Sequence, residues 1–254
     1  PADLTTQLLS AEDGRCVSYA EADTTSVRIA NALLQLGAVP GDRVTVQVEK
    51  SPENLLLYLA CLRAGLVYHP LNTAYKPAEV AYFLDNAQPS VVVCADDARA
   101  TIASLLPNDG NTKLLTLNLD GSGSLMQLAA AASSDAGIAQ REGSDMAALL
   151  YSSGTTGRPK GIVLTHDNLR SNAQTLVDIW GFTAADRLLH LLPIYHVHGL
   201  LVAVSCVLMS GASMVWHSRF SDVAAIAAMP DCTVMMGVPT YYTRLLANPA
   251  FTAA

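Results

Sequence analysis

The chain has 254 residues, of which 51% are hydrophobic and 15% charged, and its formal net charge is −7. So much apolar material allows a substantial core and excludes intrinsic disorder. The negative charge argues against a surface for nucleic acid or for an anionic membrane, and we expect neither partner. The longest apolar stretch, Gly199 to Met209, is too short to span a bilayer, and the N-terminus lacks the basic start and apolar core of a signal peptide.

The cysteines indicate a reducing compartment. They are an odd number and lie at widely spaced positions, mostly within apolar runs: Cys16, Cys61, Cys94, Cys206 and Cys232. Their spacing matches no common set of metal ligands. We therefore expect reduced core residues of a cytoplasmic protein.

Helical and strand patterns alternate along the chain. Apolar stripes and capping residues predict helices at 19–36, 53–64, 77–86, 97–106 and 200–209, one that Asp167 caps and that runs to Trp180, one that Ser221 caps, and a last one that carries Arg244. Short alternating or β-branched runs predict strands at 44–48, 91–94, 114–117, 146–150, 162–164, 188–192, 212–216 and 233–236. Residues 107–145 are the least regular part. The alternation predicts an α/β fold of stacked, largely parallel sheets with flanking helices, as one large domain or two small ones.

The stretch from Tyr151 to Gly161, YSSGTTGRPKG, has the composition of a phosphate-binding loop. Its glycines let backbone N–H groups turn toward an anion, its hydroxyls donate further hydrogen bonds, and Lys160 adds a positive charge. A Walker A loop is excluded, because there the Lys precedes Ser or Thr and opens a helix, whereas here Gly161 follows Lys160 and a strand follows the loop. The alternative is a plain Gly- and Ser-rich hairpin.

The order of motifs resembles the adenylate-forming superfamily of acyl-CoA synthetases, luciferases and peptide-synthetase adenylation domains. SSGTTGRPKG matches the phosphate-loop signature of that family at ten consecutive positions, and GDRV, RAG and HPLN support the match earlier in the chain. The later segments PIYHVHGLLVA, LMSGASMV and MGVPTYYTRLL are most similar to malonyl-CoA synthetases.

The resemblance also implies how the chain is organised. Residues 1–254 correspond to part of the N-terminal large domain of such an enzyme, with the phosphate loop at 151–161 and acyl-pocket segments at 193–200 and 237–246. The family's later magnesium-binding Glu, its ribose-binding Asp and the catalytic Lys of its small C-terminal domain have no counterpart before Ala254. We therefore expect the missing C-terminal domain to be the functional complement of this chain, and the chain alone to be inactive.

In that family a carboxylate attacks the α-phosphorus of ATP, pyrophosphate leaves, and the acyl group then passes from the adenylate to coenzyme A. The resemblance implies that Lys160 is catalytic and that the ATP phosphates are bound by Ser152, Ser153, Gly154, Thr155, Thr156, Gly157 and Lys160. Ser152 also stands where the family contacts Mg²⁺. Positioning and charge neutralisation are the main demands of this chemistry.

Six residues of the two acyl-pocket segments are expected at the acid. His196 matches a catalytic position at the junction of acyl and nucleotide sites, and the acyl pocket is implied to include His198, Arg244, Val238, Pro239 and Thr240. A dicarboxylate such as malonate or methylmalonate buries a second carboxylate, which needs a cation, and Arg offers a bidentate fit. Each His has the alternative of a core residue, and Arg244 that of a solvated helix face.

Two other functions stay open. A short- or medium-chain monocarboxylate:CoA ligase would have no use for both His198 and Arg244. A non-catalytic nucleotide-binding domain of the same fold would not need Lys160 and the loop hydroxyls.

Overall fold

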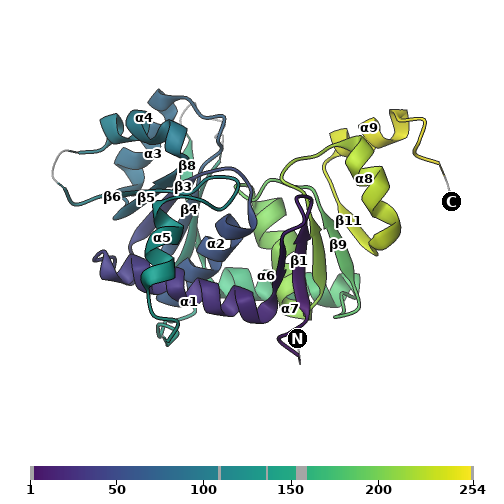
Figure 1. Ribbon diagram of the computed structural model, residues 1–254, viewed down its shortest axis with the longest axis horizontal. Helices are drawn as coiled ribbons and strands as arrows, with labels where there is room; N and C mark the ends of the chain where they lie inside the picture. Colours follow the sequence, from purple (N-terminus) through teal and green to yellow (C-terminus); the bar gives the residue numbers. More distant parts are fainter. Residues whose placement is uncertain (1–2, 108–109, 136, 153–158, 253–254) are drawn as a thin grey trace. The chain divides into compact units, whose positions relative to one another are not determined.

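The computed structural model describes residues 3–107, 110–135, 137–152 and 159–252 (Figure 1). The chain divides into two compact units. Unit 1 consists of Pro1–Ala22 together with Arg170–Ala254, and unit 2 of Asp23–Leu169. Two helices, α1 (Tyr19–Gln35) and α6 (His166–Trp180), run across the unit boundaries.

Unit 2 is built on a six-stranded sheet with the order β6-β5-β3-β4-β7-β8. Its strands are β3 (Arg43–Gln47), β4 (Val67–Pro70), β5 (Val91–Cys94), β6 (Lys113–Thr116), β7 (Met146–Ser152) and β8 (Lys160–Thr165). All neighbours are parallel except β7 and β8, which form an antiparallel hairpin at one edge. The predicted largely parallel sheet is therefore confirmed in this unit, with an antiparallel exception that carries the candidate phosphate loop.

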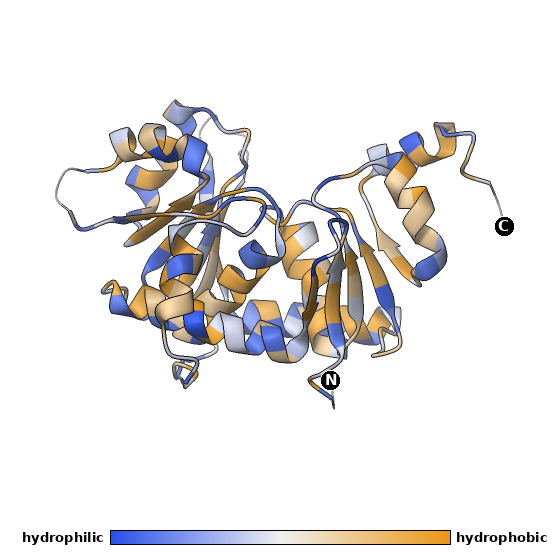
Figure 2. Cartoon of the chain, viewed as in Figure 1, coloured by the Kyte–Doolittle hydropathy of each residue, from blue (hydrophilic) through white to orange (hydrophobic). Residues whose placement is uncertain are grey.

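Helices cover both faces of this sheet. In Figure 1, α3 (Pro77–Ala87) and α4 (Arg99–Leu105) lie on one face, and α2 (Pro52–Ala64) and α5 (Ser124–Ala131) on the other. Right-handed crossovers require this arrangement, because the strand order reverses between β4 and β5 and again between β6 and β7. Among the enclosed strands β5 is apolar and buried along its whole length (Figure 2).

Local sequence determines where helix α2 begins and ends. Ser51 accepts a hydrogen bond from the Asn54 amide, Pro52 occupies the first turn, and Gly65 ends the helix in the left-handed conformation with φ 69°. Gly65 is well suited to this role because a side chain there would be strained and would meet Arg141. The predicted end at Ala64 is confirmed, and the helix begins one residue before the predicted Glu53.

Unit 1 holds a five-stranded sheet with the order β11-β9-β10-β1-β2. Its strands are β1 (Gln7–Ala11), β2 (Cys16–Ser18), β9 (Arg187–His190), β10 (Ser213–Trp216) and β11 (Val234–Met236), and only β2 runs antiparallel. It wholly contains α7 (Ser205–Ser210), α8 (Asp222–Ala228) and α9 (Pro239–Ala247), and most of α6. Ser221 caps α8 by accepting from the Ala224 amide, as predicted.

Some elements differ from the sequence prediction. Asp167 does not cap α6. The cap is Thr165, whose hydroxyl accepts from the Asn168 amide while the Asn168 side chain accepts from the Thr165 amide. The predicted helix 200–209 is a π-helix, η2 (His198–Val204), followed by α7. Strands β1, β2 and β4 and helix α5 were not predicted, because they are short or mix polar residues into the run.

Candidate active site

The candidate phosphate loop closes the hairpin of β7 and β8 in unit 2. Ser152 and Lys160 are the last pair of this hairpin. The predicted ligands Ser153, Gly154, Thr155, Thr156 and Gly157 lie outside the described residues. What the structure describes is the base of the loop, where a hydroxyl and an ammonium group stand on facing strand ends.

The two residues of this last pair differ in exposure. Lys160 is exposed at the start of β8, and Ser152 is half-buried at the end of β7. Because β8 is the edge strand of its sheet, its first residues are open to an incoming ligand. An exposed ammonium group opposite a hydroxyl donor suits an anion such as a phosphate.

Tyr151, next to Ser152, packs against residues below the loop base and on the facing strand. Its ring centroid lies 4.6 Å from that of Phe83 and 5.3 Å from that of the buried His69. It also packs over Gly161, since a Cβ placed at Gly161 would lie 3.5 Å from the Tyr151 ring. An aromatic side chain covering a glycine on the facing strand is a known way to stabilise such a pair.

The first predicted acyl-pocket segment, 193–200, follows β9 in unit 1. His190 is the last residue of β9, is buried, and stacks on Trp216 with 4.7 Å between ring centroids. Its Nε2 donates a hydrogen bond to the carbonyl oxygen of Gly199 at 2.9 Å. This bond ties the start of η2 to the carboxyl end of the sheet, the edge at which ligands bind in open α/β folds.

Gly199 has no room for a side chain. A Cβ there would clash with the carbonyl oxygen of Pro193. The segment therefore doubles back on itself so tightly that the PIYHVHG stretch needs a glycine at its end. A π-helix begins at the neighbouring His198, and π-helical turns often occur at functional sites.

The two predicted histidines have different surroundings. His196 packs edge-on against Tyr195 with 4.6 Å between centroids, and partial burial lowers its pKa below the usual value. It is therefore neutral at pH 7 and able both to donate and to accept a hydrogen bond. His198 is half-buried at the first position of η2.

His198 lines a cavity of about 300 Å³ in unit 1. The other lining residues come from the end of α6, from β11 and from the segment after it: Trp180, Phe182, Val234, Met235, Met236, Gly237 and Tyr242. The fold thus brings the two predicted acyl-pocket segments to one cavity through His198 and Gly237. Trp180, Phe182 and the β11 residues were not predicted as site residues. The place of β11 directly before the 237–246 segment was a signal for it, because ligands bind at the carboxyl ends of parallel strands, whereas Trp180 and Phe182 reach the cavity only through packing.

The other predicted acid-binding residues lie on α9. Val238 precedes this helix and is 37% exposed, and Pro239 and Thr240 form its exposed first turn. Arg244 is on the same helix, with its side chain 57% exposed. Its Nη2 lies 2.9 Å from Oδ1 of Asp222, and its guanidinium lies 4.8 Å from the centre of the Phe220 ring.

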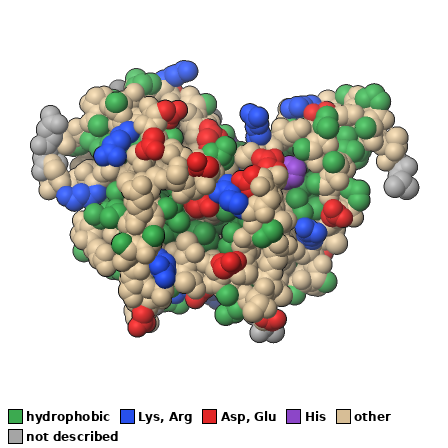
Figure 3. Space-filling model, viewed as in Figure 1, with side chains coloured by type: hydrophobic (Ala, Val, Ile, Leu, Met, Phe, Trp, Pro, Cys, Tyr) green, Lys and Arg blue, Asp and Glu red, His purple; other side chains and the backbone are tan. Residues whose placement is uncertain are grey.

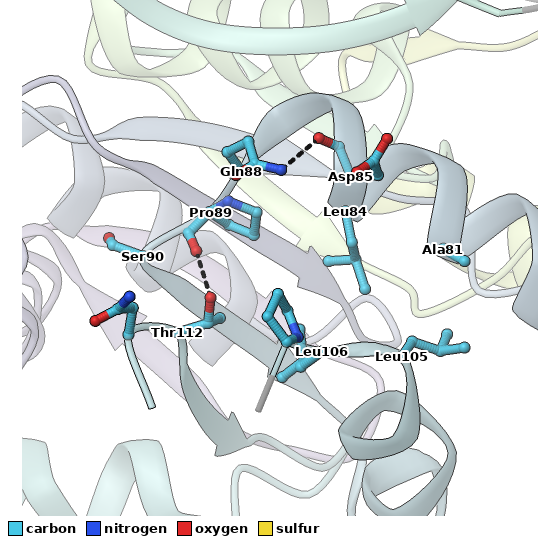
Figure 4. Close-up of a pocket in the computed structure, with 11 residues that line it drawn as sticks. Ala81, Leu84, Asp85, Gln88, Pro89, Ser90, Leu105, Leu106 and Thr112 are labelled. Carbon is cyan, nitrogen blue, oxygen red and sulfur yellow. Dashed lines mark hydrogen bonds between the residues drawn. The ribbon is translucent and has the colours of Figure 1, made fainter. Parts of the chain in front are cut away.

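A second cavity, of about 290 Å³, lies in unit 2 and contains none of the predicted site residues (Figure 4). It is formed at the end of α3, where Gln88 adopts the left-handed conformation with φ 48°. The Thr112 hydroxyl donates to the carbonyl oxygen of Pro89 along its wall.

The cysteines differ in exposure. Cys61, Cys94 and Cys206 are buried free thiols, as expected, whereas Cys16 is exposed.

Within residues 3–107, 110–135, 137–152 and 159–252, no group of three His, Cys, Asp or Glu side chains is placed to hold a metal. No helix in this part of the chain is both long and apolar enough to cross a membrane. Charged side chains of both signs are interspersed on the face shown in Figure 3.

Comparison with known proteins identifies the family. The model of the AMP-binding enzyme family matches residues 5–254. The chain belongs to this family.

Individual members show how far the likeness extends. The chain is 30% identical to a sulfoacetate–CoA ligase of Cupriavidus necator, with 95% of this chain and 48% of the relative aligned. It is also 30% identical to the mitochondrial malonate–CoA ligase of Homo sapiens, with 90% of this chain and 41% of the relative aligned. The chain thus spans about half the length of the curated relatives that it matches.

Solved structures agree with this result. The crystal structure of ATP-bound MatB from Rhodopseudomonas palustris superposes with a TM-score of 0.95 at 47% identity, covering 98% of this chain and 50% of that one. An inhibitor-bound structure of the N-terminal domain of FACL13 from Mycobacterium tuberculosis gives a TM-score of 0.87 at 26% identity, covering 97% of this chain and 62% of that one. The fold is therefore that of the N-terminal part of an adenylate-forming enzyme.

Proposed function

We propose that this chain is the nucleotide- and acid-binding part of an AMP-forming acid–thiol ligase that joins malonate or methylmalonate to coenzyme A. The observation that carries the proposal is the Ser152–Lys160 pair at the base of the loop, in a fold that superposes on ATP-bound MatB with a TM-score of 0.95. Malonate–CoA ligases among the relatives support the choice of acid.

The loop supplies the charge complementarity that the adenylation step requires. Negative charge builds on the pyrophosphate as the bond to the α-phosphorus breaks, so catalysis depends on fixed donors and cations around the β- and γ-phosphates. In this proposal Ser152 and Lys160 act from the strand ends, and residues 153–157 complete the cradle.

Mg²⁺ is part of the proposal because it usually takes one or two protein oxygens and completes its shell with water and phosphate. The Ser152 hydroxyl is an oxygen donor of the right kind at the loop base. The ion would neutralise phosphate charge. Coenzyme A is the proposed acceptor of the acyl group, and the free thiols are consistent with a reducing compartment, for which we propose the cytoplasm.

Arg244 is the proposed partner for the second carboxylate of the acid. Its ion pair with Asp222 uses Nη2, while the guanidinium group carries further N–H donors on Nε and Nη1. The Asp222 contact and the Phe220 ring hold the side chain in one orientation, which lowers the cost of ordering it around a ligand. His198 and the neutral His196 are proposed to contact the acid from the other segment.

The cavity at His198 favours one alternative. Its walls include Trp180, Phe182 and Met235, side chains that suit an apolar acyl group more than a second carboxylate. A monocarboxylate:CoA ligase therefore stays a candidate. Feruloyl-CoA synthases are among the relatives at 30% identity.

Substrate comparison in the full-length protein tests the proposal. By full-length we mean this chain joined to the C-terminal part that the relatives' length predicts. AMP formation is measured with ATP, Mg²⁺, coenzyme A and one acid at a time, namely malonate, methylmalonate, acetate or butyrate. The proposal expects the highest kcat/KM for malonate or methylmalonate, and no pyrophosphate release by residues 1–254 alone. A higher kcat/KM for butyrate would make the monocarboxylate ligase the correct function.

A further inference from the structure

Two side chains of helix α3 form hydrogen bonds at the two ends of the candidate phosphate loop. The Tyr82 hydroxyl donates a hydrogen bond to the carbonyl oxygen of Pro159 at 2.8 Å. One helical turn further, the side-chain oxygen of Asn86 accepts a hydrogen bond from the Tyr151 hydroxyl. Tyr82 and Asn86 are four residues apart, so they lie on the same face of the helix.

One of these two hydrogen bonds involves β7, and the other involves the residue just before β8. Pro159 immediately precedes β8, and Tyr151 is the penultimate residue of β7. The two residues therefore adjoin the Ser152–Lys160 pair, Tyr151 next to Ser152 within β7 and Pro159 next to Lys160 just before β8. Both bonds, as well as the hairpin itself, lie within unit 2.

The end of this hairpin needs such support. β8 is an edge strand, and its first four residues, Lys160 to Val163, are exposed. A terminal strand pair at an edge has few buried contacts and opens easily. A side chain that holds the backbone next to Lys160 from a packed helix removes part of that freedom.

The helix is itself well fixed. Phe83, the neighbour of Tyr82, is 1% exposed and packs in a core cluster with Val80 and Leu84 of the same helix and Val92 of β5. Its ring lies 5.6 Å from that of Tyr82 and 4.6 Å from that of Tyr151. Tyr82 and Asn86, which we call the α3 anchor, thus connect the core of unit 2 to the ends of the loop.

We propose that Tyr82 and Asn86 are positioning residues, which hold Lys160 and Ser152 at the spacing needed for the ATP phosphates. This inference rests on the proposed function in that it takes the bound anion to be a polyphosphate. Neither residue is proposed to touch the ligand. Their effect is to reduce the ordering that the loop base undergoes when the nucleotide binds.

The test is a comparison of ATP with AMP as ligands of Tyr82→Phe in the full-length protein. The variant keeps the ring and loses only the hydroxyl. We expect ATP to bind about three- to tenfold more weakly, the effect of losing one hydrogen bond, and AMP, which lacks the β- and γ-phosphates, to bind with unchanged affinity. Asn86→Ala, which removes the other bond, should show the same selective loss.

Tyr75→Phe is the matched control. Tyr75 is half-buried against the same Phe83 ring, at 5.0 Å between centroids, and its hydroxyl has no hydrogen-bond partner among the described residues. This variant should bind ATP as the parent protein does. An equal loss of ATP and AMP in Tyr82→Phe, or an equal loss of ATP in Tyr75→Phe, would overturn the inference.

A second readout separates this inference from the proposed function. Amide hydrogen exchange is followed across residues 146–165 without any nucleotide. Tyr82→Phe should speed exchange at the Ser152–Lys160 end and leave it unchanged at the Leu149–Val163 pair further along the hairpin. If the parent protein binds no ATP, the proposed function fails, while faster exchange at this end still supports the anchor. Unchanged exchange there contradicts the anchor whatever binds.

Discussion

Arg244 and Asp222 join α9 to α8 through an ion pair of 2.9 Å. Asp222 also accepts from the side-chain amide of Asn248, and these contacts hold the pKa of its carboxyl below the usual value. Asp222 is therefore ionised at pH 7, and Arg244 has one anionic partner before any substrate binds. A substrate carboxylate has to share the guanidinium group with Asp222 or displace it.

Arg244→Ala should act selectively on dicarboxylates. In the full-length protein we expect kcat/KM for malonate to fall about 10- to 100-fold, since charge-assisted hydrogen bonds to the second carboxylate are lost. Use of butyrate should change little, because that acid has no second carboxylate. The measurement is AMP formation with each acid.

Arg219→Ala is the control for Arg244, because Arg219 is an exposed cation of the same unit, three residues from Asp222. Its removal alters net charge equally and should affect neither acid. A parallel loss of malonate and butyrate use in Arg244→Ala would indicate that Arg244 stabilises α9 and does not contact the acid.

Lys160→Ala should weaken ATP binding without unfolding the protein. Lys160 is exposed at the start of β8, so little packing depends on it. We expect about tenfold weaker binding of ATP and an unchanged Tm, because one charge-assisted contact to phosphate is removed. Titration calorimetry and thermal unfolding measure the two effects. Lys113→Ala, at an exposed position of β6, is the matched control and should leave ATP affinity unchanged.

His69 should make stability depend on pH. It is fully buried, its Nδ1 shares a hydrogen bond of 2.8 Å with the Thr45 hydroxyl, and its Nε2 has no partner among the described residues. Burial, with a smaller effect of Arg43, lowers its pKa to about 3. Since the unfolded state takes up the proton near pH 6.5, stability is complete above that pH and is lost as the pH falls toward 3.

The size of this effect can be measured by urea unfolding. Between pH 7.5 and pH 5 the His69 contribution should fall by about 2 kcal/mol, which follows from 1.36 kcal/mol for each pH unit below the unfolded pKa. His69→Gln keeps a polar partner for Thr45 and has no proton to gain, so its pH dependence should be smaller by that amount. An identical pH dependence in the two proteins would show that His69 is protonated in the folded state.

Gly199→Ala should disturb the first predicted acyl-pocket segment. The added Cβ meets the carbonyl oxygen of Pro193, which is backbone and cannot swing away. We expect a loss of about 1–3 kcal/mol in stability, typical of overpacking, together with a raised KM for the acid. At Gly137 an added Cβ meets nothing within 4 Å, so Gly137→Ala is the control and should be neutral in both assays.

Much of the fold follows from local sequence. The strand at 91–94 and the helices beginning near Tyr19 and Pro77 agree with prediction within a residue or two, because β-branched runs and helical stripes are local signals. The Gly, Ser and Lys composition of the loop and its strand–loop–strand context also identify the family without coordinates.

Other features depend on contacts between distant residues. Strand β4, VYHP, has no strand signature of its own, and it forms because β3 and β7 pair with it on either side in a sheet whose faces are covered by helices. The Tyr82–Pro159 bond joins residues 77 apart in the chain. The partner of Arg244, the buried state of His69 and the cavity at His198 likewise come from packing. Sequence by itself determined most of the local elements and predicts the chemistry of the loop, since propensity and turn residues act over a few positions. Only the tertiary structure decided which side chains pair, because those contacts arise when segments far apart in the chain are buried together.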